Sequence, residues 1–126
     1  MRLVDSCGWI ELLAGTRLGR LYVEALQTPS RLIVPTVCLL EVTRRIEGQF
    51  GLVAASTAAA QMDQGVSVAL DAALALEAAR SGLETGLPCA DSIIYATARR
   101  HGAEVWTHDA HFRGLPGVRF VEPAGG

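Results

Sequence analysis

The chain has 126 residues, half of them hydrophobic, which is enough for one domain with its own buried core. Its formal net charge of −2 excludes a general polycation, so nucleic-acid binding would need a local patch or a bound metal. The sequence shows no membrane span, signal-peptide pattern or CxxC spacing, so we expect one domain over residues 1–126, in the cytoplasm and without a membrane partner.

The first half of the chain alternates short apolar runs with segments of helical periodicity. The expected elements are a strand at 2–5, helices at 6–14 and 17–27, a strand at 31–34, and helices at 36–47 and 52–64. Ser6 and Thr36 are placed as N-caps, and Gly48 as the end of the third helix. That helix carries an apolar stripe formed by Cys38, Leu39, Val42, Ile46 and Phe50.

The second half repeats the alternation. The expected elements are a strand at 66–70, helices at 71–82 and 88–101, a strand at 104–107, a helical turn at 109–113 and a strand at 118–121, before a frayed tail at 122–126. Asp71 is a plausible N-cap, and Pro88 suits a first helical turn. Strands alternating with helices predict an α/β fold with a mostly parallel central sheet flanked by helices.

Four acidic residues fall where such a sheet would gather them. Asp5 and Asp109 follow predicted strands, while Glu41 and Asp91 lie near the starts of predicted helices. Ligands of open parallel sheets bind beyond the carboxyl ends of the strands. We therefore expect the four carboxylates to converge at one edge of the sheet.

Each acid also has a possible structural role. Asp5 and Asp109 could cap the helical turns that follow them. Glu41 could form a solvent-exposed pair with Arg45 at i+4, worth a few tenths of a kcal/mol. Asp91 is harder to explain in this way, because helical spacing places it at the edge of a buried face, where an unpaired carboxylate is costly.

A cluster of four carboxylates predicts a metal. At 4 Å, each pair repels by about 1 kcal/mol in water and about 4 kcal/mol at an effective dielectric constant of 20. Cations offset this repulsion, and hard oxygen ligands select Mg²⁺ or Mn²⁺, which also accept phosphate oxygens. Two less favoured metal sites are zinc held by His108, Asp109 and His111, and thiolate sites using Cys7, Cys38 or Cys89.

The motifs around the acids resemble those of a known family. They are Leu3-Val4-Asp5-Ser6, Val34-Pro35-Thr36-Val37-Cys38-Leu39-Leu40-Glu41-Val42, Asp91-Ser92-Ile93-Ile94-Tyr95-Ala96-Thr97-Ala98, and Val105-Trp106-Thr107-His108-Asp109 followed by Phe112. In order and spacing they resemble the PIN domain family, and more narrowly its VapC-type ribonuclease toxins, over nearly the whole chain.

The resemblance implies a PIN-like three-layer fold and a magnesium-dependent endoribonuclease, with Mn²⁺ able to replace Mg²⁺. Asp5 and Asp91 would be the main metal ligands, and Glu41 and Asp109 would complete the catalytic site. Ser6 and Thr107 would be supporting polar residues. Products with a 5′-phosphate and a 3′-hydroxyl are expected.

The resemblance also implies an RNA substrate, a cognate antitoxin that covers the groove, and a homodimer or a toxin–antitoxin hetero-oligomer. Candidate contacts to RNA phosphates or to the antitoxin are Arg44, Arg45, Arg99 and Arg100. Two other functions stay open at this point. They are a structure-specific DNA nuclease on the same metal site and a non-catalytic PIN-like RNA-binding module.

Overall fold

The strands form one parallel sheet in the computed structural model, which describes residues 1–123. The strands are β1 (Arg2–Val4), β2 (Leu32–Pro35), β3 (Val66–Val68), β4 (Glu104–Thr107) and β5 (Val118–Phe120). Their order across the sheet is β3-β2-β1-β4-β5. The predicted α/β fold with a parallel central sheet is confirmed.

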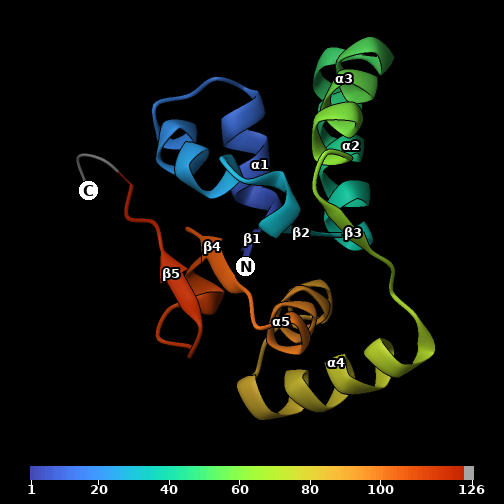
Figure 1. Cartoon of the computed structure of the whole chain (residues 1–126), viewed down its shortest axis with the longest axis vertical. Helices are drawn as coiled ribbons and strands as arrows, with labels where there is room; N and C mark the ends of the chain where they lie inside the picture. Colours follow the sequence, from blue (N-terminus) through green and yellow to red (C-terminus); the bar gives the residue numbers. More distant parts are fainter. Residues whose placement is uncertain (124–126) are drawn as a thin grey trace.

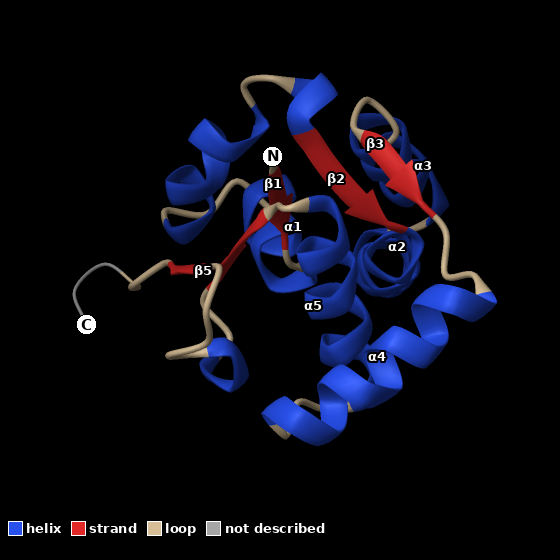
Figure 2. Cartoon of the chain, turned by 60° about the horizontal axis from the view of Figure 1, so that its bottom comes forward, coloured by secondary structure: helices blue, strands red, loops and turns tan. Residues whose placement is uncertain are grey.

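Helices cover both faces of this sheet and make a three-layer structure. The α-helices are α1 (Ser6–Leu13), α2 (Thr36–Phe50), α3 (Leu52–Met62), α4 (Ala72–Thr85) and α5 (Cys89–His101). Figure 1 shows α1, α2 and α3 on one side of the row formed by β1, β2 and β3, and α5 and α4 on the other. Figure 2 shows α4 lying along α5. Because both faces are covered, strand residues such as Leu3, Ile33 and Val105 are fully buried.

The strand order reverses beside β1, and this reversal positions the acids. The chain runs outward from β1 through β2 to β3, then returns to the other side of β1 to form β4 and β5. Val4 pairs with Trp106, and the Asp5 backbone N–H donates to the Trp106 carbonyl at 3.0 Å. The ends of β1 and β4 therefore lie side by side at a topological switch point, where ligands bind in folds of this kind.

Two helices run past the glycines that were predicted to end them. Helix α2 continues through Gly48 and ends at Gly51, whose φ of 91° favours glycine. Gly48 has open space around it and costs a helix only about 1 kcal/mol, too little to end one anchored by buried Val42 and Ile46. The prediction that Phe50 joins the buried stripe is wrong, because its side chain is 63% exposed.

Helix α4 likewise continues through Gly82 to Thr85 and ends at Gly86, whose φ is 75°. Gly82 faces Ser92 of α5 so closely that an added Cβ would lie 3.2 Å from the Ser92 Cβ. This glycine therefore serves helix packing rather than helix termination. Asp71 caps α4 as predicted, accepting from the Leu74 backbone N–H at 2.8 Å.

The segment predicted as a helix at 17–27 forms 3₁₀ turns instead, η1 (Leu18–Leu26). Gly19 packs against the backbone of Glu11 and Leu12, so the segment folds tightly over the end of α1. Two further 3₁₀ turns are η2 (Pro29–Arg31) and η3 (Ala110–Phe112).

The remaining differences lie at element ends. Thr36 is the first residue of α2 rather than its N-cap, which is Pro35. In the predicted tail, Glu122 forms an ion pair with Arg113 at 2.8 Å, and 124–126 lie outside the described residues. No helix within residues 1–123 combines the length and apolar character needed to span a membrane.

Candidate metal centre

Asp5 lies immediately after β1 and is the N-cap of α1, a position predicted for Ser6. Its side chain is buried, and its Oδ1 accepts a hydrogen bond from the Ser6 backbone N–H at 2.8 Å. Its Oδ2 accepts from the Thr107 hydroxyl at 2.8 Å and from the Cys7 thiol at 3.5 Å. Asp5 therefore acts as a cap while its second oxygen points toward the end of β4.

Thr107 joins the two strand ends through one hydroxyl group. The side chain is fully buried and donates to Asp5. The same oxygen accepts from the Asp109 backbone N–H at 2.9 Å. A buried hydroxyl with both partners satisfied fixes the separation of the two acid-bearing segments.

Ser6 links α1 to α2. Its hydroxyl donates to Glu41 Oε1 at 2.7 Å, so the Glu41 carboxylate is turned into the groove rather than along its own helix. Within residues 1–123, no ion pair forms between Glu41 and Arg45. Ser6 and Thr107, the two predicted supporting residues, therefore each donate a hydrogen bond to one of the acids.

Asp91 and Asp109 meet around His111. Asp91 lies in the first turn of α5, and Asp109 is the N-cap of η3, where its Oδ1 accepts from the His111 backbone N–H at 2.9 Å. The His111 Nδ1 lies 3.2 Å from Asp91 Oδ2 and 3.1 Å from Asp109 Oδ1. One potential ligand atom from each of these residues lies within 4.8 Å of the other two.

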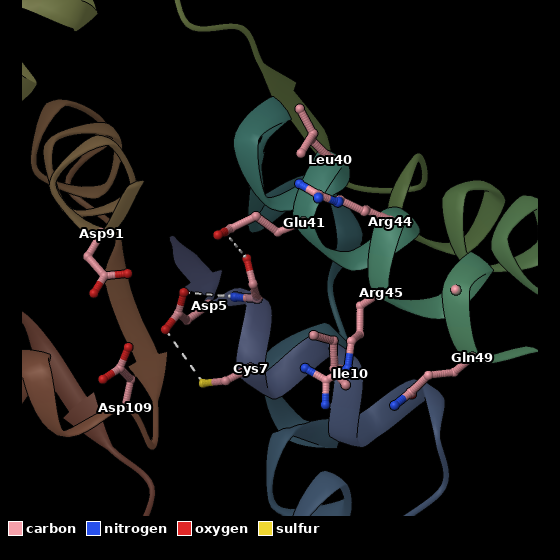
Figure 3. Close-up of a pocket in the computed structure, with 12 residues that line it drawn as sticks. Asp5, Cys7, Ile10, Leu40, Glu41, Arg44, Arg45, Gln49, Asp91 and Asp109 are labelled. Carbon is pink, nitrogen blue, oxygen red and sulfur yellow. Dashed lines mark hydrogen bonds between the residues drawn. The ribbon is translucent and has the colours of Figure 1, made fainter. Parts of the chain in front are cut away.

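The four acids line one groove of about 590 Å³. Figure 3 shows Asp91 and Asp109 on one side, facing Asp5 and Glu41 on the other. Segments from residue 5 to residue 109 thus deliver carboxylates to the end of the sheet where the strand order reverses.

The electrostatics of this groove leave negative charge uncompensated. Burial, followed by the charges of Asp5 and Asp109, raises the pKa of Asp91 from 3.8 to about 6, although His111 acts in the opposite direction. Burial also raises the pKa of Asp5, with Asp109 adding to the effect, while hydrogen bonds from Thr107, Ser6 and Cys7 partly offset it. Oxygen-rich ligands with excess negative charge fit a hard divalent cation.

The cysteines do not form a thiolate site. Burial, followed by the charge of Asp5, raises the pKa of Cys7 to about 12, so its thiol is neutral and donates to Asp5. Cys38 is fully buried in the core, where burial raises its thiol pKa, whereas Cys89 is exposed. A neutral thiol in the core and an exposed one elsewhere do not make a common metal site.

His108 and His111 separate rather than share a zinc site. The His108 Nδ1 lies 2.6 Å from the Tyr22 hydroxyl, and the two rings meet edge to face. Asp91 takes the place of His108 beside Asp109 and His111. The sequence pattern grouped Asp109 with His111 but did not indicate the contact of His111 with Asp91. The Asp-x-His spacing is a signal for the first pair, because an aspartate in such a turn accepts a hydrogen bond from the backbone two residues on.

The four predicted arginines also fall into two groups. Arg44 and Arg45 line the groove with the acids (Figure 3). Arg99 and Arg100 lie at the C-terminal end of α5, about 12 Å along the helix from Asp91. Arg100 bonds Glu77 at 2.7 Å, and Arg99 stacks over the Tyr95 ring, so the structure does not bring this pair to the groove.

The PIN domain family model matches residues 2–118, and the chain therefore belongs to the PIN domain family. None of the curated proteins compared with the chain gives a significant sequence match.

Solved structures with the same fold include components of toxin–antitoxin systems. A toxin–antitoxin complex from Klebsiella pneumoniae matches with a TM-score of 0.83 and 23% identity, and the match covers 97% of this chain and 98% of the chain in that complex. VapC20 from Mycobacterium tuberculosis, described as a sarcin–ricin loop cleaving toxin, has a TM-score of 0.68 and 22% identity, covering 86% and 88%. DNA-bound VapBC from Salmonella typhimurium has a TM-score of 0.71 and 17% identity, covering 95% and 97%. At these identities the likeness shows a common fold.

Proposed function

We propose that this chain is a magnesium- or manganese-dependent endoribonuclease and the toxin of a toxin–antitoxin pair. The observation that carries the proposal is the convergence of Asp5, Glu41, Asp91 and Asp109 in one open groove, where burial and the neighbouring acids raise the pKa of Asp91 to about 6. Site and family support it together, because groups with strongly perturbed pKa values cluster at functional sites.

The chain's residues would have distinct roles in this reaction. Asp5 and Asp91 would hold the metal, and Glu41 and Asp109 would complete the site directly or through water. The bound ion would supply an activated water and neutralise charge on the phosphate. Ser6 and Thr107 already orient the carboxylates of Glu41 and Asp5 through hydrogen bonds of 2.7 and 2.8 Å, so these ligands need no rearrangement before substrate arrives.

The arginines that line the groove suggest how a polyanion would enter it. Arg44 and Arg45 stand beside the acids on α2 and can donate paired hydrogen bonds to phosphate oxygens. The same surface would receive the antitoxin, which must then compete with RNA for it. Toxin–antitoxin complexes among the similar solved structures support such a partner. The chain would act in the cytoplasm, either as a homodimer or as a hetero-oligomer with the antitoxin.

Cleavage of structured RNA by the purified chain, freed of any partner, tests the proposal. We expect cleavage in Mg²⁺ or Mn²⁺, none in EDTA, and products with 5′-phosphate and 3′-hydroxyl ends. Asp91→Asn should lower the cleavage rate on the order of 10²- to 10³-fold, whereas Asp63→Asn, which alters an exposed acid outside the groove, should not.

Other outcomes would point to the alternative functions. Preferential cleavage of branched DNA would indicate a structure-specific DNA nuclease. RNA binding without millimolar affinity for either metal would indicate a binding module. A fully active Asp91→Asn protein would contradict the assignment of the metal site.

A further inference from the structure

His111 was expected to hold a metal only in the less favoured zinc site with His108, yet its Nδ1 lies between two acids of the centre. The atom is 3.1 Å from Asp109 Oδ1 and 3.2 Å from Asp91 Oδ2. The side chain is 60% exposed, so burial does not force it into this position. The contacts therefore need another explanation.

Backbone geometry brings the ring to this place. Asp109 caps η3 and accepts from the His111 backbone N–H at 2.9 Å, so the same carboxylate contacts both the backbone and the imidazole of His111. Asp91 approaches from α5, a separate element. Three potential ligand atoms from two directions thus lie within 4.8 Å of one another beside the groove.

The spacing of these atoms suits one shared ion. Ligands at about 2.1 Å from a six-coordinate ion, at right angles to one another, are about 3 Å apart. The two nitrogen–oxygen distances of 3.1 and 3.2 Å match this value. A histidine that only hydrogen-bonds to the two carboxylates would have the same spacing. Measuring which metal ion binds, and whether a histidine nitrogen is coupled to it, distinguishes this role from that of a ligand.

We propose that His111 is a nitrogen ligand of the metal centre and makes the centre prefer Mn²⁺ to Mg²⁺. This inference rests on the proposed metal-dependent function and adds a specificity-determining residue to it. Mg²⁺ favours an all-oxygen shell, whereas imidazole suits transition metals, among which Mn²⁺ also accepts carboxylate and water. Replacing His111 should therefore change which metal binds, and not simply how tightly any metal binds.

Electron paramagnetic resonance of Mn²⁺ bound to the full chain gives a readout independent of activity. Electron spin-echo modulation should show a ¹⁴N coupling in the wild-type protein, and histidine labelled with ¹⁵N should change it to the ¹⁵N pattern. The coupling should be absent in His111→Ala and present in His101→Gln, a control at the far end of α5.

Calorimetry with Mg²⁺ alone and Mn²⁺ alone provides the second measurement. His111→Ala should weaken Mn²⁺ binding by at least about tenfold and Mg²⁺ binding by less. His111→Asp, which supplies an oxygen ligand in place of nitrogen, should shift the preference toward Mg²⁺. The Asp variant also tests the inference if the Ala variant folds poorly.

The outcomes distinguish the two proposals. Mn²⁺ binding without a histidine nitrogen coupling in the wild-type protein would overturn the role of His111 and leave the metal centre standing. A coupling that persists in His111→Ala would also overturn it. Failure of the wild-type chain to bind either metal would overturn the metal centre itself and, with it, this inference.

Discussion

On one wall of the groove, Asp5 is buried and accepts three hydrogen bonds, whereas on the other, Asp91 and Asp109 are partly exposed and share one imidazole nitrogen. The first, the hydroxyl wall, consists of Asp5, Ser6, Glu41 and Thr107. The second, the histidine wall, consists of Asp91, Asp109 and His111. Neutral donors fix the position of a carboxylate without cancelling its charge, so the hydroxyl wall gives rigidity and leaves charge balance to the opposite wall and the proposed cation.

The largest expected effect is on the cleavage rate, when one charge is removed from either wall in a single variant. Asp5→Asn and Asp91→Asn should each lower the rate of metal-dependent RNA cleavage on the order of 10²- to 10³-fold, as removal of one electrostatic group from an active site does. Cleavage assays at saturating Mn²⁺ would measure this. Equal losses would show that both walls serve one metal centre.

The stability of the same two variants should differ. Asp91→Asn removes a repelling charge and should raise the free energy of unfolding of the metal-free protein. Asp5→Asn places an amide N–H₂ group against the Thr107 and Cys7 donors and should not raise it. Urea unfolding would compare them, and a stabilised Asp5→Asn protein would contradict the distinction between the walls.

Thr107→Val removes the hydroxyl that joins Asp5 to Asp109 and keeps a similar shape. We expect metal affinity to fall by about 10- to 100-fold, because groups that orient ligands have effects of this size. Calorimetric titration with Mn²⁺ would measure it. Thr107→Ser retains the hydroxyl and should bind nearly as well as the wild-type protein; equal loss in both variants would indicate a packing defect instead.

The pH dependence of stability should report on the histidine wall. The folded protein holds the Asp91 proton more tightly than the unfolded chain, because the Asp91 pKa rises from 3.8 to about 6 on folding. The free energy of unfolding of the metal-free protein should therefore fall across this pH range, on the order of 1–2 kcal/mol after allowance for solvent screening. Thermal unfolding in EDTA from pH 4 to 7 would measure the slope.

The raised pKa of Asp5 also makes the free energy of unfolding fall as pH rises. Comparing the wild-type protein with Asp91→Asn therefore isolates the contribution of Asp91. That variant should show a shallower fall, and so should wild-type protein saturated with Mn²⁺. Identical slopes in wild-type and Asp91→Asn proteins would contradict the assignment of the effect to Asp91.

The smallest effects are expected where the groove extends beyond both walls. Arg44→Gln or Arg45→Gln should weaken RNA binding a few-fold. Each should also reduce the number of counterions released on binding, read from the slope of log K against log[salt], by about one. Fluorescence anisotropy in the Asp5→Asn background, in which cleavage is slowed, would measure this. Arg100→Gln provides a matched control, because Arg100 is paired with Glu77 away from the groove.

Much of the sheet could be predicted because parallel strands covered on both faces read as short apolar runs. In a parallel sheet, the residues just beyond Val4 and Thr107 have to lie at the same edge, so the strand pattern predicts this common edge for Asp5 and Asp109. That the two acids are neighbours follows from the pairing of β1 with β4, which the pattern does not give. The position of the Glu41 carboxylate could not be predicted in this way, because its spacing was also consistent with a solvent-exposed ion pair with Arg45. Its contact with Ser6 depends on how α1 meets α2.

Other features depended on packing that local patterns do not encode. Gly82 is a good helix terminator by composition but lies within α4 because α5 approaches it closely. His111 and Asp91 are 20 positions apart, and only the placement of η3 against α5 brings them together. Arg99 and Arg100 follow Asp91 on the same helix, yet eight or nine positions carry them to its opposite end.

Because β4 pairs with β1 near the middle of the sheet, the groove cannot form while the chain is only partly synthesised. The ribosome has to release the chain as far as Asp109 before Thr107 can reach Asp5 and before Asp91 gains its neighbours. In the proposed ribonuclease, the metal centre would therefore be incomplete until the ribosome has released this segment. Late insertion of β4 beside β1 would thereby delay the proposed activity, and an antitoxin would have until that moment to be ready.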